Sequence, residues 1–313
     1  MTQPLVSVAI PAYNHAAFIE ACLASVCAQT YPELELIVID DGSPDTTFET
    51  AERFLAGRRD RFRRVVLTRQ ENRGVCATSN AVIEAAHGEW VHLLGSDDVL
   101  YPQAVEKTQQ AIAAWQCPEL ALVHADIDMI DAAGAVIAGK RLEKDRPAPG
   151  VDAEAWRWLF FNRQYIFNPT VALRREAVLA IGGFDARLAL EDLDCWLRLS
   201  LRYPIARVPE VLARYRKHAG NTSRRRLMML GALLHTYGNF LAKEESRFSA
   251  AEIRQHFHRN LYQVWRRFRV HRPAWLPTVA AAWIGAWLQP PQAADYHRFG
   301  DMVERLVAEG RAS

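Results

Sequence analysis

The stretch that decides the fold is Val6-Ser7-Val8-Ala9-Ile10-Pro11-Ala12-Tyr13-Asn14, close to the start of the 313-residue chain. Its apolar, β-rich run predicts a buried strand that stops at Pro11, because proline has no backbone N–H to donate to a sheet. Tyr13 and Asn14 then follow in the loop at the carboxyl end of that strand. A bound ligand or a plain strand-to-helix turn would each account for this loop.

The same alternation of short apolar runs and helical patterns continues through the first hundred residues. Strands are predicted at residues 6–10, 34–39, 64–68 and 90–94, and helices at 16–28, 46–56, 75–86 and 102–115. Apolar strands that alternate with helices predict an α/β fold, with a parallel sheet covered by helices on both faces. Ligands bind at the carboxyl ends of the strands in such folds.

Two further strand ends carry paired carboxylates. Asp40-Asp41-Gly42-Ser43 follows the second strand, where a carboxylate can accept a hydrogen bond from a heterocyclic base stacked on Tyr13. A turn at Gly42 with a helix cap by Asp45 is the alternative. Gly95-Ser96-Asp97-Asp98 follows the fourth strand, where two carboxylates suit Mg²⁺ or Mn²⁺ bridging phosphates, although a helix cap would explain one of them.

The pattern changes after residue 120. A short strand, a hairpin at Gly134 and a Trp- and Phe-rich segment at 156–167 come first. A strand at 170–173, a turn at 182–185, a helix at 192–201 and a strand at 211–215 follow them, and every later segment has a helical pattern. We therefore expect a helical C-terminal region at 224–313.

Together these motifs resemble family 2 glycosyltransferases of the GT-A fold. The resemblance is carried, over roughly residues 5–223, by Pro11-x-Tyr13-Asn14, Asp40-Asp41-Gly42-Ser43, Asn72-Arg73-Gly74 with Ala77 and Asn80, Gly88-Glu89-Trp90, and Ser96-Asp97-Asp98. It implies a GT-A, Rossmann-like catalytic domain at residues 1–223, with a nucleotide-sugar-binding half at 1–120 and an acceptor-binding half at 121–223. It also implies transfer of a sugar from a nucleotide-diphosphate donor, with inversion at the anomeric carbon and help from Mn²⁺ or Mg²⁺.

The resemblance also assigns roles to single residues. Tyr13 and Asp41 would contact the nucleoside base, while Asp97 and Asp98 would form the metal and ribose site, with Asp98 as the direct metal ligand. Many family members have a further Asp at the position of Gly95, so this chain has fewer ligands. Asn72 capping the next helix is the alternative to a donor contact. The other residues implied at the donor site are Pro11, Asn14, Asn72, Arg73 and Asn80, with Asp40 as a further candidate.

Two later segments complete the resemblance. Glu191-Asp192-Leu193-Asp194 resembles the family's Glu-Asp motif, so Asp192 would be the general base, its pKa raised by Glu191 and Asp194. An acidic first helical turn is the alternative. Tyr215-Arg216-Lys217-His218 resembles the stretch that closes the catalytic body. There the cation-rich loop, with Arg216 as a candidate, would fold over the diphosphate, and His218 would bind the metal or a phosphate, unless His218 is purely structural.

Composition narrows the partners and the location. The net charge of +2 argues against a nucleic-acid partner. Five cysteines without a C-x-x-C pair predict neither a disulfide framework nor a zinc site. The first residues lack a signal-peptide pattern, so we expect a cytoplasmic protein. Phosphate-loop, dinucleotide-binding, metalloprotease and serine-hydrolase motifs are also missing.

The C-terminal region has a different charge from the rest of the chain. Residues 224–313 hold 14 Lys and Arg against 7 Asp and Glu, and four of the nine tryptophans. Its apolar stretch at 274–288 is broken by Pro277 and is too short to span a bilayer. Peripheral contact with the inner face of the cell membrane, where a lipid-linked acceptor would be presented, is one role that this composition allows. Packing on the catalytic domain or a homodimer contact is the alternative.

The sequence thus predicts a metal-dependent inverting glycosyltransferase that moves one sugar from a UDP or dTDP donor to a glycan acceptor. The product would be a cell-surface polysaccharide such as O-antigen, capsule or exopolysaccharide. Single addition is favoured because the chain has neither spanning helices nor the Gln-x-x-Arg-Trp motif of the family's processive synthases. A catalytically inactive nucleotide-sugar-binding protein and a membrane-docking assembly protein are the alternatives.

Overall fold

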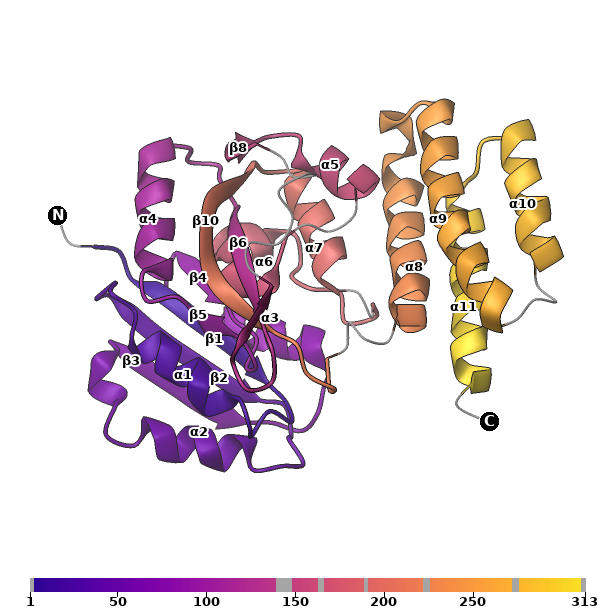
Figure 1. Cartoon of the computed structure of the whole chain (residues 1–313). Helices are drawn as coiled ribbons and strands as arrows, with labels where there is room; N and C mark the ends of the chain where they lie inside the picture. Colours follow the sequence, from indigo (N-terminus) through magenta and orange to yellow (C-terminus); the bar gives the residue numbers. More distant parts are fainter. Residues whose placement is uncertain are drawn as a thin grey trace. The chain divides into compact units, whose positions relative to one another are not determined.

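The computed structural model describes residues 3–138, 148–162, 166–188, 191–221, 226–271 and 276–310 (Figure 1). The chain divides into two compact units. The first comprises Met1–Ala186 and Cys195–His218, and the second comprises Arg187–Asp194 and Ala219–Ser313. The short segment Arg187–Asp194, which includes Asp192, therefore belongs to the unit that holds the C-terminal helices.

The first four strands form the parallel part of the first unit. They are β1 (Val6–Ala12), β2 (Leu34–Asp40), β3 (Arg64–Arg69) and β4 (Trp90–Leu93), and they lie in the order β3-β2-β1-β4. β1 pairs in parallel with both β2 and β4, and all seven of its residues are apolar or small. Four predicted strands are therefore confirmed, and the central position of β1 explains its burial.

The sequence had predicted that strand β1 stops at Pro11, and this prediction is wrong. Its pairing with β2 continues through Pro11 opposite Ile39 to Ala12 opposite Asp40. Its pairing with β4 covers only Val6 to Ala9. Because β1 has no neighbour on the β4 side at Pro11, the missing N–H of the proline costs no ladder hydrogen bond.

Helices cover both faces of this sheet. They are α1 (Ile19–Cys27), α2 (Thr47–Leu55), α3 (Val75–Ala85) and α4 (Ala104–Trp115), with a 3₁₀ turn at Arg59–Arg61. The connections β1 to β2 and β2 to β3 run in one direction along the sheet, whereas β3 to β4 returns past β1. Right-handed crossovers therefore place α1 and α2 on one face and α3 on the other, as Figure 1 shows.

The rest of the unit extends the same sheet with mixed strand directions. The additional strands are β5 (Val99–Leu100), β6 (Leu122–Ile130), β7 (Val136–Ala138), β8 (Gly150–Asp152), β9 (Ala172–Arg174) and β10 (Ile205–Arg216). The helical elements are α5 (Ala155–Asn162), a 3₁₀ turn at Asn168–Thr170, α6 (Arg175–Ala180) and α7 (Glu191–Ser200), of which residues 191–194 belong to the second unit. β9 is antiparallel to both β4 and β6, whereas β10 is parallel to β6. The predicted hairpin at Gly134 is present, with β7 antiparallel to β6.

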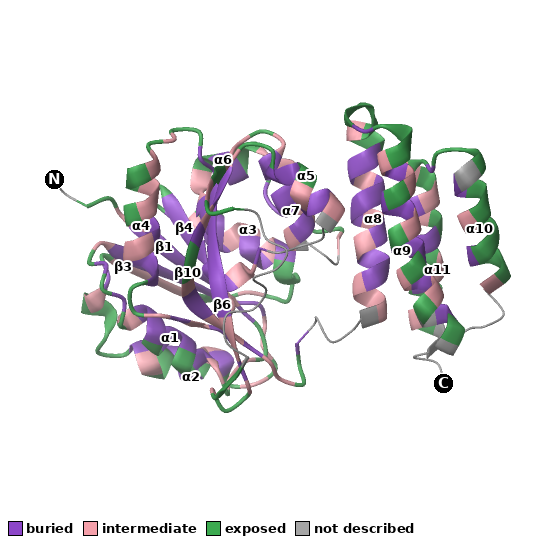
Figure 2. Cartoon of the chain, turned by 45° about the horizontal axis from the view of Figure 1, so that its top comes forward, coloured by how far each residue is buried: buried purple, intermediate pink, exposed green. Residues whose placement is uncertain are grey.

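The second unit is helical. Its elements are α8 (Arg226–Glu244), a 3₁₀ turn at Glu245–Arg247, α9 (Ala250–His271), α10 (Leu276–Leu288) and α11 (Ala293–Gly310). Figure 2 shows buried residues along α8 and exposed ones along α10. Within the described ranges, every helix is too short or too polar to cross a membrane.

Candidate functional site

The loop after β1 is held by side chains of the loop after β2. Three consecutive backbone N–H groups, of Asn14, His15 and Ala16, donate to Ser43 Oγ, Thr47 Oγ1 and Asp45 Oδ2 at 2.8, 2.8 and 2.9 Å. Asn14 has a φ of +56°, a left-handed conformation that asparagine tolerates better than most residues. The Tyr13 side chain is 47% exposed, so this loop offers a free aromatic ring.

Asp41 organises the loop that follows β3. Its Oδ1 accepts hydrogen bonds from Gln70 Nε2 and from the backbone N–H of Arg73, and its Oδ2 accepts one from the N–H of Gly74. Asn72 and Arg73 are exposed within this loop. The N-cap of α3 is Gly74 and has no side-chain cap hydrogen bond, so the geometry gives no support to Asn72 as a cap.

Gly42 and Asp40 shape the turn beside Asp41. Gly42 has a φ of +68°, and a Cβ there would lie 2.9 Å from the backbone N of Asn72. Asp40 is buried, and its Oδ1 accepts hydrogen bonds from Ser43 N and Arg69 Nε. Asp40 therefore supports the turn and pairs with Arg69, an arrangement that the sequence did not specify.

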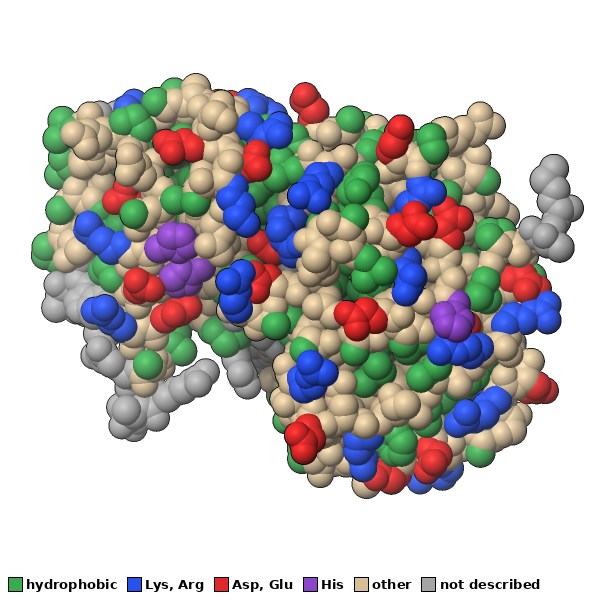
Figure 3. All heavy atoms as spheres, turned by 180° about the vertical axis from the view of Figure 1, so that it is seen from behind, with side chains coloured by type: hydrophobic (Ala, Val, Ile, Leu, Met, Phe, Trp, Pro, Cys, Tyr) green, Lys and Arg blue, Asp and Glu red, His purple; other side chains and the backbone are tan. Residues whose placement is uncertain are grey.

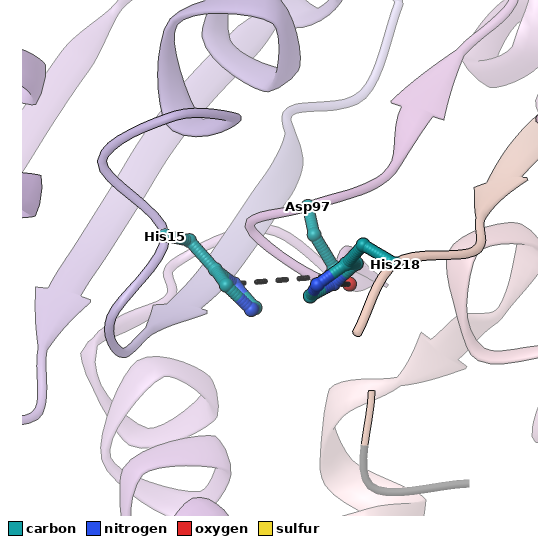
Figure 4. A group of neighbouring side chains, drawn as sticks. All are labelled: His15, Asp97 and His218. Carbon is teal, nitrogen blue, oxygen red and sulfur yellow. Dashed lines mark hydrogen bonds and ion pairs between the residues drawn. The ribbon is translucent and has the colours of Figure 1, made fainter. Parts of the chain in front are cut away.

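The side chains of three possible metal ligands, His15, Asp97 and His218, meet at the carboxyl end of β4 (Figure 4). His218 Nε2 lies 2.9 Å from Asp97 Oδ2, and His15 Nδ1 lies 3.9 Å from Asp97 Oδ1. The ligand atoms of His15, Asp97 and His218 all lie within 4.8 Å of one another, which is close enough for one ion to touch all three. Ser96 Oγ, 2.7 Å from His15 Nδ1, and the ring of Phe18, 4.6 Å from that of His218, flank the cluster.

The cluster holds ionised and neutral groups side by side. Burial alone would raise the pKa of Asp97, but hydrogen bonding, chiefly with His218, outweighs it, so this pKa is lowered. Burial lowers the pKa of His15 and so favours the neutral imidazole that can bind a metal. Burial and the nearby Asp97 charge raise the pKa of Asp98 well above its usual range.

Asp98 and Arg216 form the buried support of the cluster. Asp98 Oδ1 accepts a hydrogen bond from the backbone N of Arg216, 2.8 Å away. The buried guanidinium of Arg216 donates to the carbonyls of Asp97, Asp131 and Ala132. The sequence had placed Arg216 among the candidates at the diphosphate. Its side chain instead points into the protein, where it anchors the segment after β10 that carries His218.

Asn80 is also occupied by protein contacts. Its Nδ2 donates to the carbonyl of Phe184 at 2.9 Å, and its Oδ1 accepts from the N–H of Phe184 at 2.8 Å. A Cβ at Gly183 would lie 2.4 Å from Asn80 Oδ1. The asparagine therefore fastens the Gly182-Gly183-Phe184 turn to α3.

Asp192 lies at the start of α7, where its Oδ1 accepts a hydrogen bond from the N–H of Leu193 at 2.7 Å. Asp192 and Asp194 are half-buried, and the side chain of Glu191 lies outside the described residues. Because this segment belongs to the second unit, it is described apart from the cluster at β4. Its role as a base stays a prediction.

Sequence reasoning missed His15. The residue directly follows Asn14 in a loop already predicted to bind the donor, and its place between the ends of two adjacent parallel strands was the available signal. What could not be seen was that Asp97, instead of Asp98, joins His218 in the cluster. Adjacent residues in a turn point in different directions, and only the fold decides which one faces the ligand.

The fold agrees with comparisons to known proteins. The family model "Glycosyl transferase family 2" matches residues 7–180. An uncharacterized protein of Mycobacterium tuberculosis is 33% identical over 237 residues, covering 72% of this chain and 71% of that protein. The hyaluronan synthase of Pasteurella multocida is 29% identical over 230 residues, but the match covers 72% of this chain and only 22% of the synthase.

Two solved structures have the same fold. The mannosyltransferase of Pyrobaculum calidifontis, in complex with GDP-Man and Mn²⁺, is 20% identical with a TM-score of 0.58, covering 98% of this chain and 86% of that one. Residues 1–349 of TarS from S. aureus, in complex with UDP-GlcNAc, are 18% identical with a TM-score of 0.59, covering 98% and 92%. The predicted GT-A fold is confirmed, and the chain is an enzyme that belongs to glycosyltransferase family 2.

Proposed function

We propose that this glycosyltransferase is metal-dependent and inverting, and that it moves one sugar from a nucleotide-diphosphate donor to a hydroxyl group of a glycan. The single observation that carries the proposal is the cluster of His15, Asp97 and His218 at the end of β4, whose His15 belongs to the same loop as Tyr13. The similarity to a hyaluronan synthase supports a role in cell-surface polysaccharide synthesis, such as O-antigen, capsule or exopolysaccharide.

The ligand set formed by His15, Asp97 and His218 fits a divalent cation. Two imidazoles and one carboxylate favour Mn²⁺ over Mg²⁺, which prefers oxygen ligands and keeps most of its water. We assign direct metal ligation to Asp97 and not to Asp98, because the buried Asp98 carboxylate accepts a hydrogen bond from the backbone N of Arg216. A Cβ at Gly95 would lie 3.0 Å from Asp97 Oδ1, so this position lies beside the cluster but supplies no ligand, whereas His15 supplies an imidazole. When bound, the ion neutralises charge on the departing diphosphate.

The neighbouring loops can bind the nucleotide. Tyr13 offers an exposed ring for stacking on the base. Asp41 Oδ2 accepts from Gly74 N and has a second lone pair for the N3–H of uracil or thymine, so a UDP or dTDP donor is favoured. Pro11, Asn14, Asn72 and Arg73 lie in or beside the same loops. Asn80 we assign to positioning the turn at Phe184.

Asp192 is proposed as the general base. Inversion needs one base to take the proton of the acceptor hydroxyl while its oxygen attacks the anomeric carbon. The segment that carries Asp192 also contains Glu191 and Asp194, whose charges would favour the protonated form after transfer.

The acceptor is proposed to be lipid-linked, with the C-terminal helices at the membrane surface. Tyr262, Ile284 and Leu288 expose 45%, 64% and 80% of their surface on α9 and α10. Arg266 and Arg269 are exposed one and two turns beyond Tyr262 on α9, and Arg269 lies 5.1 Å above the ring of Trp265. Exposed apolar and aromatic side chains beside arginines are suited to an anionic bilayer surface.

A thermal-shift screen tests the donor site. UDP, dTDP, GDP and CMP are added with and without Mn²⁺ to the wild type and to Asp97→Asn and Asp98→Asn. A ligand at 100 times its Kd stabilises the folded state by about 2.7 kcal/mol. We expect one diphosphate to raise the melting temperature only with Mn²⁺, and we expect Asp97→Asn to abolish the effect. Folded protein that responds to no nucleotide would refute the proposed donor site.

A further inference from the structure

Helices α8 and α11 each carry a histidine followed three positions later by a glycine. The segments are His235-Thr236-Tyr237-Gly238 on α8 and His297-Arg298-Phe299-Gly300 on α11. Each glycine makes room for the histidine of the other helix. A Cβ at Gly300 would lie 2.6 Å from His235 Nε2, and a Cβ at Gly238 would lie 2.8 Å from His297 Nε2. The two helices therefore pack antiparallel, with each imidazole seated on the opposite backbone.

The two rings form a stacked, hydrogen-bonded pair. Their centroids are 5.4 Å apart with an interplanar angle of 28°, and His235 Nδ1 lies 3.1 Å from His297 Nδ1. One Nδ1 must donate and the other accept, so the rings cannot both be protonated while this bond holds.

The far nitrogen of His235 faces two carboxylates. His235 Nε2 is a buried atom without a hydrogen-bond partner among the described residues. Asp301 Oδ1 lies 3.6 Å away and Glu304 Oε1 lies 3.4 Å away, one turn and two turns beyond His297 on α11. The ligand atoms of His235, Asp301 and Glu304 all lie within 4.8 Å of one another. Figure 3 shows histidine side chains on the surface of the helical unit, with acidic side chains beside them.

We propose that His235, Asp301 and Glu304 bind a divalent transition-metal ion of the Zn²⁺ type, with His297 as the partner that orients His235. One imidazole nitrogen and two carboxylate oxygens are a ligand set that Zn²⁺ accepts, with water in the remaining position. Donation from His235 Nδ1 to His297 fixes the tautomer whose Nε2 lone pair faces the ion. The carboxylates are 58% and 56% exposed, which leaves an open path from solvent.

This site is separate from the proposed donor site and serves a different purpose. It joins α8, the first helix after the catalytic body in sequence, to α11, the last helix of the chain. An ion shared between them would stabilise the folded helices, because a ligand that binds only the folded state adds to its stability. The failure of this proposal would leave the proposed glycosyltransfer unaffected.

Zinc binding to the full chain tests the proposal. Chelator-treated protein is titrated with Zn²⁺ by calorimetry, for the wild type, for the double variant Asp301→Asn with Glu304→Gln, and for His297→Ala. A control, Glu119→Gln with Glu245→Gln, removes two exposed charges elsewhere. We expect the Asp301 and Glu304 variant to bind one Zn²⁺ fewer than wild type and control, and His297→Ala to keep that site with about 10- to 100-fold weaker affinity.

Circular dichroism first establishes that each variant is folded, which the exposure of both carboxylates favours. Equal Zn²⁺ stoichiometry in the wild type and the Asp301 and Glu304 variant would overturn the proposal. It would also be overturned if neither protein bound the ion here and the substitutions changed only the pH dependence of melting.

Discussion

His218 Nε2 lies 2.9 Å from Asp97 Oδ2, although the two residues are 121 positions apart in the chain. The contact joins the end of β10 to the turn after β4. It depends on a buried frame, in which the backbone N of Arg216 donates to Asp98 and the side chain of Arg216 donates to the carbonyl of Asp97. Asp97 therefore belongs to the cluster, whereas the adjacent Asp98 fixes the backbone of Arg216, two residues before His218.

The histidines of the cluster are expected to set the affinity for the metal. His15→Ala and His218→Ala each remove one nitrogen ligand, so the Mn²⁺ concentration needed for nucleotide stabilisation should rise about 10-fold or more. The measurement is a Mn²⁺ titration of the melting temperature at saturating nucleotide. Glu20→Gln, on the exposed face of α1, is the control. An unchanged midpoint for His15→Ala would remove His15 from the ligand set.

Asp98→Asn is expected to stabilise the metal-free protein at neutral and higher pH. Burial and the Asp97 charge raise the pKa of Asp98 in the folded state, so the stability it contributes is complete below about pH 3.9 and decreases as pH rises. Asparagine keeps the acceptor for the N–H of Arg216 and does not titrate. Melting curves recorded in chelator at pH 5 to 8 should show that Asp98→Asn melts at a higher temperature than the wild type, by a difference that grows with pH. Each kcal/mol of added stability corresponds to about 2–4 °C. A gain that is constant across this range would contradict the argument.

His92 is expected to contribute to acid unfolding. It is buried on β4 and burial lowers its pKa to about 4. The unfolded chain therefore binds a proton that the folded protein excludes, so stability is complete above pH 6.5 and decreases by roughly 3 kcal/mol as pH falls towards 4. Denaturant unfolding of His92→Leu should show a shallower loss over this range than the wild type. Parallel pH curves for the two proteins would exclude His92 as the cause.

Asp192→Asn is expected to separate binding from catalysis. If Asp192 is the base, kcat for sugar transfer should fall by roughly 10²- to 10⁴-fold, while the Mn²⁺-dependent shift with nucleotide stays unchanged. Asp194→Asn, two residues further along α7, is the matched control and should lose much less activity. Retained transfer in Asp192→Asn would assign the base elsewhere, and a wild type that binds nucleotide without turnover would favour an inactive binding protein.

The exposed arginines of α9 are expected to contribute to membrane binding. Replacing Arg266 and Arg269 by Gln should weaken binding to vesicles of phosphatidylglycerol and phosphatidylcholine by about 2 kcal/mol, since each arginine near an anionic surface contributes about 1 kcal/mol. Ile284→Ser with Leu288→Ser should weaken it as well, in a manner that salt does not change. Flotation with and without the anionic lipid is the measurement. Wild-type protein that floats with neither vesicle would leave packing or dimerisation as the role of these helices.

Local sequence patterns were sufficient for the layout of the first unit. Alternating apolar runs and helical periods depend on neighbouring residues, so the positions of β1 to β4 and α1 to α4 were predicted to within a few residues. The loops at the strand ends followed, because parallel strands bring their carboxyl ends to one edge of the sheet. Short elements such as β5 and α6 were missed, since two to six residues carry too little periodicity.

Contacts between distant residues decided the rest. Pro11 could remain inside a strand only because β4 ends its pairing at Ala9, a fact of register that no local pattern contains. The inward direction of Arg216, and the choice of Asp97 over Asp98 beside His218, depend on β5, β6 and β10 meeting in one sheet. Local motifs were therefore enough to identify the family and the strand-end loops around the cluster. The tertiary structure decided which side chain in each loop faces the ligand, because that direction is set by buried hydrogen bonds between strands far apart in the chain.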